Sequence, residues 1–243
     1  MIDNDLIQSL PRADRKRLLA VCEPVELSLS EVLCEPGQAT RHVYFPTGGY
    51  ISLVTPLEGH SGLEVGMVGN EGMVGTELAL GVALVPVRAV VQGPGSALRI
   101  EAAAFREELA RSVPLQVRLA RYVYVVMAQR ATSAACLRFH EIGPRLARWL
   151  LMSQDRAHCD SFHMTQEFPA YMLGVRRVGV TIAAGVLQRA GLIEYTRGAL
   201  TVLDRPGLER AACSCYDSDL RAYARQLQHV ASPPHQPEKE PVP

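Results

Sequence analysis

The sequence predicts an α+β protein in which a half built of short strands precedes a helical half that ends in a small hairpin. Between Glu23 and Ile100, short runs of Val, Ile, Leu and Tyr alternate with glycines and prolines, as in antiparallel sandwiches and barrels. From Glu101 onward glycines become rare, and apolar residues recur at helical spacing. The charge also changes sign between the two halves.

The formal net charge of the whole chain is zero, but its charges are segregated. Residues 21–110 hold 4 arginines and 11 acidic residues, a net charge of −7, whereas residues 111–230 hold 16 arginines and 9 acidic residues, a net charge of +7. An arginine-rich half suits a polyanionic partner, because guanidinium groups match phosphate and guanine geometry. A coding bias toward arginine explains the scarcity of lysine but not this segregation.

Composition places the chain among globular proteins, with 48% apolar and 21% charged residues in 243. This excludes a disordered or collagen-like protein. No run approaches the roughly 18 apolar residues of a membrane helix, and the first residues lack the pattern of a signal peptide, so we expect a cytoplasmic location. The 6 cysteines are too scattered for a disulfide framework and are expected to be thiols.

The first half is expected to begin with one or two short amphipathic helices, at 4–21, broken at Pro11. Strands are expected at 43–45, 50–54, 63–68, 88–92 and 96–100, with turns at 58–60 and 93–95. The expected divisions are N-terminal helices at 1–20, a strand domain at 21–110, a long helix at 111–140, a basic domain at 141–230 and a disordered tail at 231–243.

The long helix, from about Pro114 to Phe139, carries apolar residues on two faces. One possibility is that the helix is sandwiched inside its own domain. The other is that one face covers the strands and the second pairs with the same helix of another subunit, and we expect this arrangement. The stripe assigned to the dimer interface is Leu119, Tyr122 and Val126.

The basic half contains the spacing of a winged helix-turn-helix. After a helix at 145–156 with the one tryptophan, Trp149, Thr165 is a suitable N-cap for a helix at 166–173. Gly174 permits a tight turn into a second helix at 175–187, and a hairpin at 192–203 follows in the position of a wing. Helix, glycine turn, helix and hairpin in this order predict DNA binding.

This layout resembles the Crp/Fnr family of bacterial transcription regulators over roughly residues 6–216. The local similarities include 165–167, 173–177, 187–193 and the hinge-like segment 139–145. The resemblance implies a cyclic-nucleotide-binding-type β-roll, a dimerisation helix and a winged helix-turn-helix. It also implies binding to palindromic DNA as a homodimer and allows RNA polymerase as a further partner. The alternative is a signal-binding or nucleotide-binding module without DNA function.

The second helix of the motif is expected to enter the major groove. Arg177 is expected to read a guanine, Val178 and Ile182 to contact thymine methyl groups, and Arg176 and the wing residue Arg197 to bind phosphates. The full set of expected DNA-binding residues is Thr165, Gln166, Arg176, Arg177, Val178, Thr181, Ile182 and Arg197.

The resemblance also points to an effector pocket, but the sequence departs from the family there. Members that bind cyclic AMP carry a Gly-Glu pair and an Arg-Ser or Arg-Thr pair, whereas this chain has Glu77 displaced by one position from Gly75 and Ala89 after Arg88. Thr132 lies near the position that faces the base. The sequence therefore disfavours cyclic AMP, assigns no certain cofactor, and leaves open another nucleotide, a small metabolite or an empty pocket.

The sequence predicts no metal site and no enzymatic activity. Cys22 and Cys34 do not make a four-cysteine iron–sulfur set, and Cys213 and Cys215 are closer than a Cys-x-x-Cys pair, with no histidine following at ligand spacing. His140 and the group His158, Cys159 and His163 are expected to be ordinary side chains. Hydrolase, phosphate-loop and metalloprotease motifs are absent from the sequence.

Overall fold

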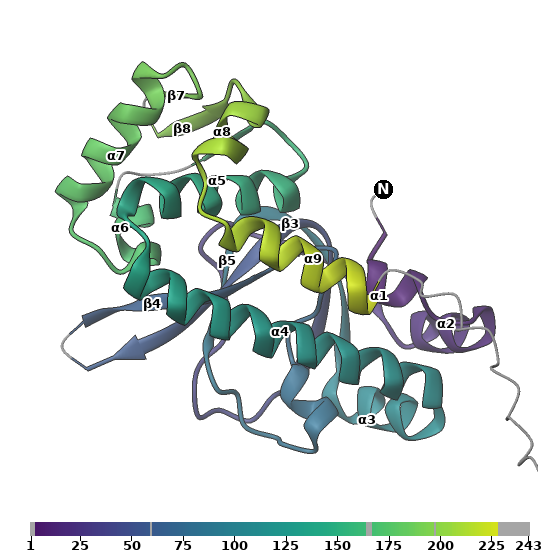
Figure 1. Cartoon of the computed structure of the whole chain (residues 1–243). Helices are drawn as coiled ribbons and strands as arrows, with labels where there is room; N and C mark the ends of the chain where they lie inside the picture. The colour runs from purple at the N-terminus through teal and green to yellow at the C-terminus, as the bar shows by residue number, and fades with distance from the viewer. Residues whose placement is uncertain (1–2, 59, 164–166, 197, 228–243) are drawn as a thin grey trace, which may run out of the picture.

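The computed structural model describes residues 3–58, 60–163, 167–196 and 198–227. The turn residue Gly59 and the tail at 231–243 therefore lie outside the described residues. Within the described ranges, an N-terminal β-roll, a long central helix and a C-terminal winged domain follow one another along the chain (Figure 1). This is the α+β architecture predicted from the sequence.

The β-roll is one antiparallel sheet with the strand order β1-β5-β3-β4, and β2 also pairs with β5. Its strands are β1 (Glu23–Leu27), β2 (Val32–Cys34), β3 (His42–Leu57), β4 (His60–Val68) and β5 (Arg88–Glu101). The helical elements around it are α1 (Asp5–Gln8), α2 (Arg12–Ala20), the 3-10 helix η1 (Thr76–Leu80), α3 (Ala102–Arg111) and α4 (Val113–Phe139). The broken N-terminal helix and the long helix were expected from the sequence, whereas β1, β2 and α3 were not.

Two expected strand pairs are single long strands. The segments 43–45 and 50–54 both belong to β3, and 88–92 and 96–100 both belong to β5. The expected turn at 93–95 lies inside β5 instead. There β3 and β5 remain paired, but the register shifts at a β-bulge between Pro46 and Tyr50. A Cβ atom on Gly95 would collide with the backbone of Gly48. The glycines therefore permit close strand packing there, and the chain does not reverse.

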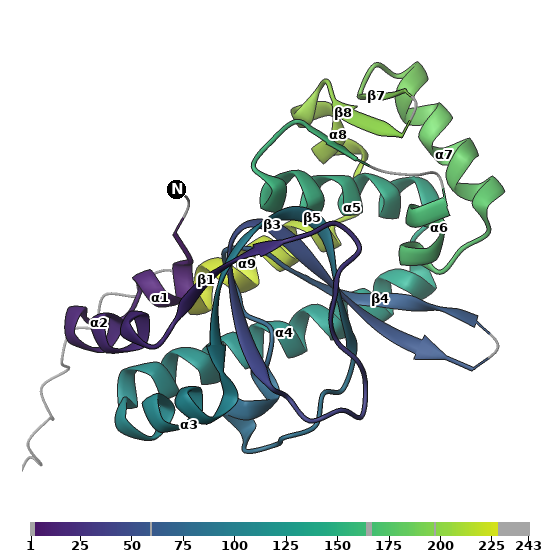
Figure 2. The same ribbon diagram turned by 180° about the vertical axis from the view of Figure 1, so that it is seen from behind.

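The winged domain, defined here as α5 to α8, contains the three-stranded sheet β6-β8-β7. A final helix, α9, returns from this domain and packs along α4, where its Tyr223 and Leu227 contact the apolar core of the β-roll (Figures 1 and 2). The elements are α5 (Ile142–Ala157), β6 (Ser161–His163), α6 (Glu167–Leu173), α7 (Arg177–Arg189), β7 (Ile193–Thr196), β8 (Ala199–Val202), α8 (Arg205–Ala211) and α9 (Cys215–Leu227).

The inner face of α4 packs on the β-roll of its own chain, which corrects the expected dimer interface. Leu119 and Tyr122 are each 1% exposed, and the Tyr122 hydroxyl accepts a hydrogen bond from the Met73 amide at 3.1 Å. Val126 is partly buried against the same core. These side chains pack inside the subunit, because the sheet of the roll has an apolar face that a helix covers. Leu119 and Tyr122 therefore do not face a second subunit.

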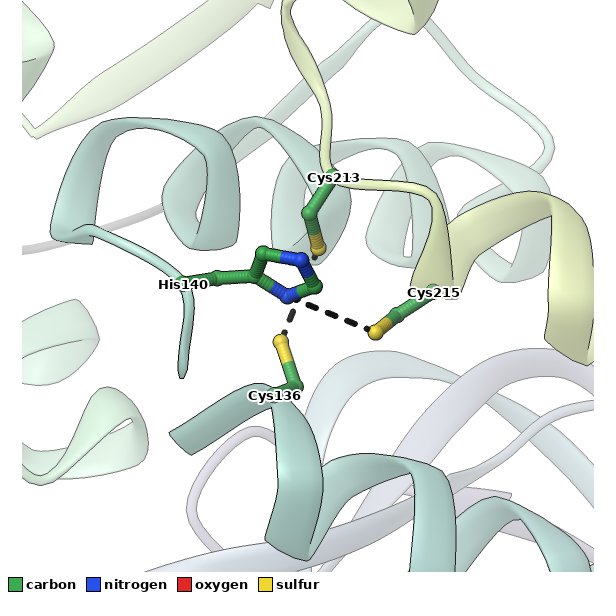
Figure 3. Close-up of side chains that lie close together, drawn as sticks. All are labelled: Cys136, His140, Cys213 and Cys215. Carbon is green, nitrogen blue, oxygen red and sulfur yellow. Dashed lines mark hydrogen bonds between the residues drawn. The ribbon is translucent and has the colours of Figure 1, made fainter. Parts of the chain in front are cut away.

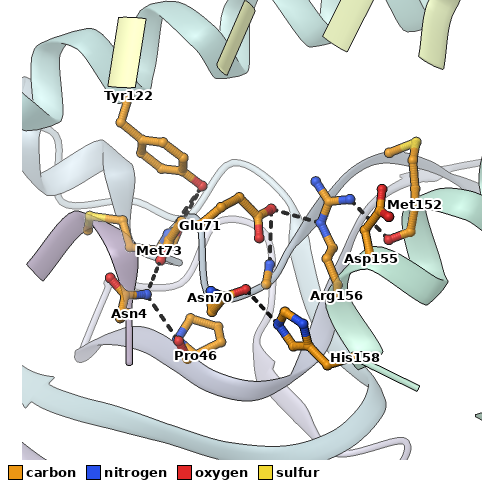
Figure 4. Close-up of polar contacts among 12 residues, drawn as sticks. Asn4, Pro46, Asn70, Glu71, Met73, Tyr122, Met152, Asp155, Arg156 and His158 are labelled. Atoms are coloured by element: carbon orange, nitrogen blue, oxygen red, sulfur yellow. Dashed lines mark hydrogen bonds and ion pairs between the residues drawn. The ribbon is translucent and has the colours of Figure 1, made fainter. Parts of the chain in front are cut away.

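A buried ion pair joins the β-roll to the winged domain. The Arg156 Nε atom in α5 donates to Glu71 Oε1 at 2.7 Å, and the two side chains are 8% and 19% exposed (Figure 4). Burial alone would lower the pKa of Arg156, but the negative charge of Glu71 raises it. Gly69 is required beside the pair, since a Cβ atom there would lie 2.6 Å from Arg156 Cγ.

Replacing Glu71 by Gln is expected to lower the free energy of unfolding by about 3 kcal/mol, because a buried guanidinium loses its counter-charge. The matched control is Glu23→Gln, which removes the carboxylate of the more exposed pair with Arg99, also at 2.7 Å. That change should cost less than about 1 kcal/mol. Urea denaturation measures both values, and equal losses would contradict the assignment of Glu71–Arg156 as the stabilising pair.

Glu64 makes a second polar contact between the roll and the winged domain. The Trp149 Nε1 atom in α5 donates to Glu64 Oε1 at 3.0 Å, and the Ser52 hydroxyl donates to the other carboxylate oxygen. Burial raises the pKa of Glu64 from 4.5 to about 7, although these hydrogen bonds favour the charged form. The folded protein therefore binds more protons than the unfolded chain between pH 4.5 and about 7.

Stability is consequently expected to fall as the pH rises through this window, and Glu64→Gln should remove this loss. The side-chain amide introduced by this substitution can accept from Trp149 through its oxygen and donate to the Ser52 hydroxyl through its nitrogen, but it cannot ionise. The free energy of unfolding of the variant relative to that of the wild type should increase by about 2 kcal/mol as the pH rises from 5 to 8. Urea denaturation of the two proteins across this range checks the prediction, and a difference that does not change with pH would refute it.

Candidate DNA interface

Helices α6 and α7 form the two arms of the helix-turn-helix. Gly174 between them adopts a φ of 62°, in the left-handed region that glycine enters at little cost. The guanidinium of Arg145 in α5 donates to the carbonyl of Leu173 at the end of α6, so the core helix of the domain holds the turn. The sequence placed the second helix at 175–187, and in the structure it begins at Arg177 because Arg176 is its extended N-cap residue.

One face of α7 is buried and the opposite face is exposed. Val180, Ala183 and Leu187 are buried in the core that α5 and α6 complete, and Ala184 packs against it. Val178 and Ile182 on the outer face are each 63% exposed. Arg176, Arg177 and Thr181 are exposed on the same helix. All five of these residues of the expected set are therefore exposed along α7 and at its N-cap.

The remaining expected DNA contacts cannot be placed in the same way. Thr165, Gln166 and the wing residue Arg197 lie outside the described residues. The wing itself has the expected form: β7 pairs antiparallel with β8, from Ile193 opposite Val202 to Thr196 opposite Ala199. Strand β6, which the sequence did not predict, adds a third strand beside β8. The hairpin is thereby held in a sheet next to α7.

The expected effector pocket is too small for a nucleotide within the described residues. Gly75 and Glu77 line a cavity of about 20 Å³ in the roll, which is roughly the space of one water molecule. Glu77 is buried and accepts a hydrogen bond from the Thr40 hydroxyl at 2.5 Å, so its carboxylate is already engaged.

The other three residues assigned to that pocket do not line it, which corrects the expectation. Arg88 forms an ion pair with Glu35 at 2.9 Å, and this contact raises the pKa of Arg88. Ala89 is fully buried in the core of the roll. Thr132 lies on α4 beyond Arg130, which is the last residue of the helix to reach the cavity.

A larger cleft, of about 380 Å³, lies where the N-terminus, the roll, α5 and α9 meet. Its arginines already have partners. Arg156 is paired with Glu71, Arg205 donates to Asp155 at 2.7 Å, and Arg118 donates to the carbonyl of Leu227. The cleft is therefore a junction between elements, in which Arg156 and Arg205 are paired with acidic side chains and Arg118 is bonded to a backbone carbonyl.

The structure also brings together four side chains that the sequence did not connect. Cys136 near the end of α4, His140 after it, Cys213 between α8 and α9, and Cys215 at the start of α9 place their ligand atoms within 4.8 Å of one another (Figure 3). The three cysteines are buried and form a small core cluster. Sequence spacing could not reveal the group because 72 residues, 141–212, lie between its two halves.

Comparisons with known proteins place the C-terminal domain in a family. A model of the Crp-like helix-turn-helix domain matches residues 144–211, which span α5 to α8. No curated protein sequence matches the chain. Within the described residues, no helix is long and apolar enough to cross a membrane.

Several solved regulators have a similar overall fold. The c-di-GMP responsive global regulator CLP from Xanthomonas campestris is 15% identical, with a TM-score of 0.65 over 79% of this chain and 99% of that protein. Two regulators of the CRP or CRP/FNR family from Thermus thermophilus are also similar. One is 22% identical with a TM-score of 0.64 over 78% of this chain and 98% of its own. The other is 23% identical with a TM-score of 0.62 over 77% and 96%.

A winged domain with an exposed second helix agrees with the match to the Crp-like helix-turn-helix model over that domain. Residues 144–211 therefore form a Crp-like helix-turn-helix domain, and the chain shares its fold with solved regulators over more than three quarters of its length.

Proposed function

We propose that the protein binds two-fold symmetric DNA sites as a homodimer and reads each half-site with α7. The observation that carries the proposal is the exposed outer face of this helix, where two apolar side chains lie beside two arginines. Val178 and Ile182 are four residues apart on this face, so their side chains form one apolar patch beside the arginines. A major groove lined with thymine methyl groups suits such a patch.

The residues of this face divide into base-reading and backbone-binding roles. Val178 and Ile182 offer methyl contacts, which favour thymine. Arg177 opens the helix and is assigned a bidentate contact with a guanine. Arg176, at the N-cap, is assigned a contact with a backbone phosphate. The Thr181 hydroxyl donates to the Arg177 carbonyl at 3.1 Å and keeps its oxygen available as an acceptor for a base amino group.

Replacing Arg177 by Ala is expected to weaken specific binding by about 1 to 3 kcal/mol and to relax base choice at one position of each half-site. Replacing Arg176 by Ala should instead weaken binding to all sequences alike and reduce the salt slope by about one unit. Selection of bound sites from random DNA, followed by affinity measurements at several salt concentrations, distinguishes the two effects.

The matched control is Arg189→Ala, at the exposed far end of the same helix. It removes the same charge and should leave the selected motif unchanged. An unchanged motif with Arg177→Ala would remove this residue from base reading. Failure of the wild-type protein to select any two-fold symmetric motif would overturn the dimeric mode of binding.

The dimer is proposed to form through the outward face of α4. Its exposed residues recur in steps of three and four, as in the seam of a coiled coil. They are Val117, Ala120, Tyr124, Met127, Ala131 and Ala134. Tyr124 and Met127 are 59% and 64% exposed, and the small residues on either side of them permit two helices to approach closely. A stripe of this kind is complementary to a second copy of itself.

Tyr124→Glu combined with Met127→Glu is expected to convert the dimer into a monomer at micromolar concentration, because it places four carboxylates in one seam. Light scattering measures the mass. Leu203→Glu is the control, since Leu203 follows β8 in the winged domain and is 57% exposed. A wild-type protein that is already monomeric, or a control that dissociates equally, would contradict the proposed interface.

The remaining parts of the proposal follow from DNA binding. The protein acts in the cytoplasm, where bacterial DNA lies, and RNA polymerase is the partner through which a bound regulator changes transcription. Its role is binding and not catalysis. The roll serves as the scaffold that supports α4, and the small volume of its cavity gives no support to a nucleotide effector at that position.

A further inference from the structure

We propose that Cys136, His140, Cys213 and Cys215 bind one zinc ion at the hinge between the long helix and the winged domain. Three cysteines and one histidine are a common ligand set for structural zinc, which binds four ligands tetrahedrally. Figure 3 shows the three thiols and the imidazole converging from three segments of the chain. The proposed site does not rest on the proposed DNA-binding function.

The distances between the ligand atoms fit a single ion. Zn–S bonds of about 2.3 Å and a Zn–N bond of about 2.0 Å at tetrahedral angles separate two sulfurs by about 3.8 Å and a sulfur from a nitrogen by about 3.5 Å. In the structure the Sγ atoms of Cys136 and Cys213 are 3.5 Å apart. Cys215 Sγ lies 3.6 Å from His140 Nδ1. Binding therefore needs only small side-chain shifts.

The backbone around the site is already held in place. The His140 amide donates to the Cys136 carbonyl at 3.1 Å, so the helical turn itself brings both side chains to one place. The Cys213 amide donates to the carbonyl of Pro144 at 3.2 Å, which anchors the link between α8 and α9 against the start of α5. Ligands fixed in this way lose little conformational freedom on binding a metal ion.

The surrounding charge favours a metal–thiolate centre. A zinc ion with three thiolates and a neutral imidazole carries a net charge of −1. Arg148 is buried beside it, and the positive charge of Arg148 interacts with Cys136 and Cys213. Its Nη2 atom binds Asp219 at 2.6 Å, but its buried Nε atom has no hydrogen-bond partner among the described residues. A thiolate sulfur would satisfy this donor, as outer hydrogen bonds do at many metal sites.

Three alternative roles of the four side chains, namely packing, a disulfide and an iron–sulfur cluster, account for their arrangement less fully than a zinc site does. Packing accounts for three small buried thiols but not for an imidazole directed at one of them. A disulfide between Cys136 and Cys213 would need the sulfurs to close from 3.5 Å to about 2.05 Å, and it would leave Cys215 and His140 without a role. An iron–sulfur cluster, whose several metal atoms lie between its ligands, holds those ligands further apart than a single ion does.

The site would hold three elements in a fixed arrangement. Cys136 and His140 mark the end of the dimerisation helix, and Cys213 and Cys215 mark the start of α9, which packs back along that helix. Loading the site binds one metal ion and releases the thiol protons, so it links the winged domain to α4 by coordinate bonds. The zinc ion thereby fixes the hinge on which the position of α7 depends.

Metal analysis of the full-length, untagged protein, purified from cells grown with added zinc, tests the proposal. We expect about one zinc per chain in wild type. Cys215→Ser should lower the zinc content at least fivefold. The control Cys159→Ser changes an exposed thiol that donates to the Ser161 carbonyl elsewhere in the domain, and it should retain the metal.

X-ray absorption at the zinc edge of the wild-type protein provides a readout that needs no variant to fold. It should report three sulfur neighbours at about 2.3 Å and one nitrogen at about 2.0 to 2.1 Å. Zinc far below one per chain, a zinc shell of nitrogen and oxygen, iron in place of zinc, a Cys136–Cys213 disulfide by mass spectrometry, or metal loss with Cys159→Ser would each overturn the proposal.

Discussion

The buried ion pair between Arg156 and Glu71 is the contact on which the arrangement of the two halves depends. It places α5 against the roll, and α5 is the core helix of the winged domain, so the position of α7 follows from it. The apolar core of that domain extends into the sheet through Tyr50, Val54 and Met67. A charge pair surrounded by such packing resists separation, because each partner would lose its counter-charge before water could replace it.

The long helix α4 has three faces with different surroundings. One face buries Leu119 and Tyr122 in the roll, a second contacts α9, and a third carries the exposed stripe around Tyr124 and Met127. A 27-residue helix that is apolar on several sides must be covered on several sides. Two of these faces are covered by the same chain, and a second copy of the helix suits the third.

The Cys136, His140, Cys213 and Cys215 cluster lies where these contacts meet. It is next to the hinge, beside Arg148, at the point where α9 turns back from the winged domain toward α4. A zinc ion there would act together with the Arg156–Glu71 pair, since both join the winged domain to the first half of the chain. The recognition helix would then be held from two sides, and the small cavity of the roll would have no part in positioning it.

The sequence by itself determined the features that depend on local order along the chain. The helix-turn-helix at 166–187, its wing and the buried and exposed faces of α7 follow from the helical period and from Gly174, which are properties of neighbouring residues. The long helix follows from the same kind of signal, and the resemblance of the order of elements to a known family extended the prediction to the β-roll.

Only the tertiary structure decided which of two apolar faces of α4 is buried in its own chain, because the sequence shows that a stripe exists but not what covers it. It also showed that Arg88 pairs with Glu35. The glycines at 93 and 95 do not form a turn but lie within β5, at a β-bulge in its pairing with β3. The metal-ligand cluster depends on α9 returning to α4, which brings residues 136 and 213 together through contacts that sequence spacing does not encode.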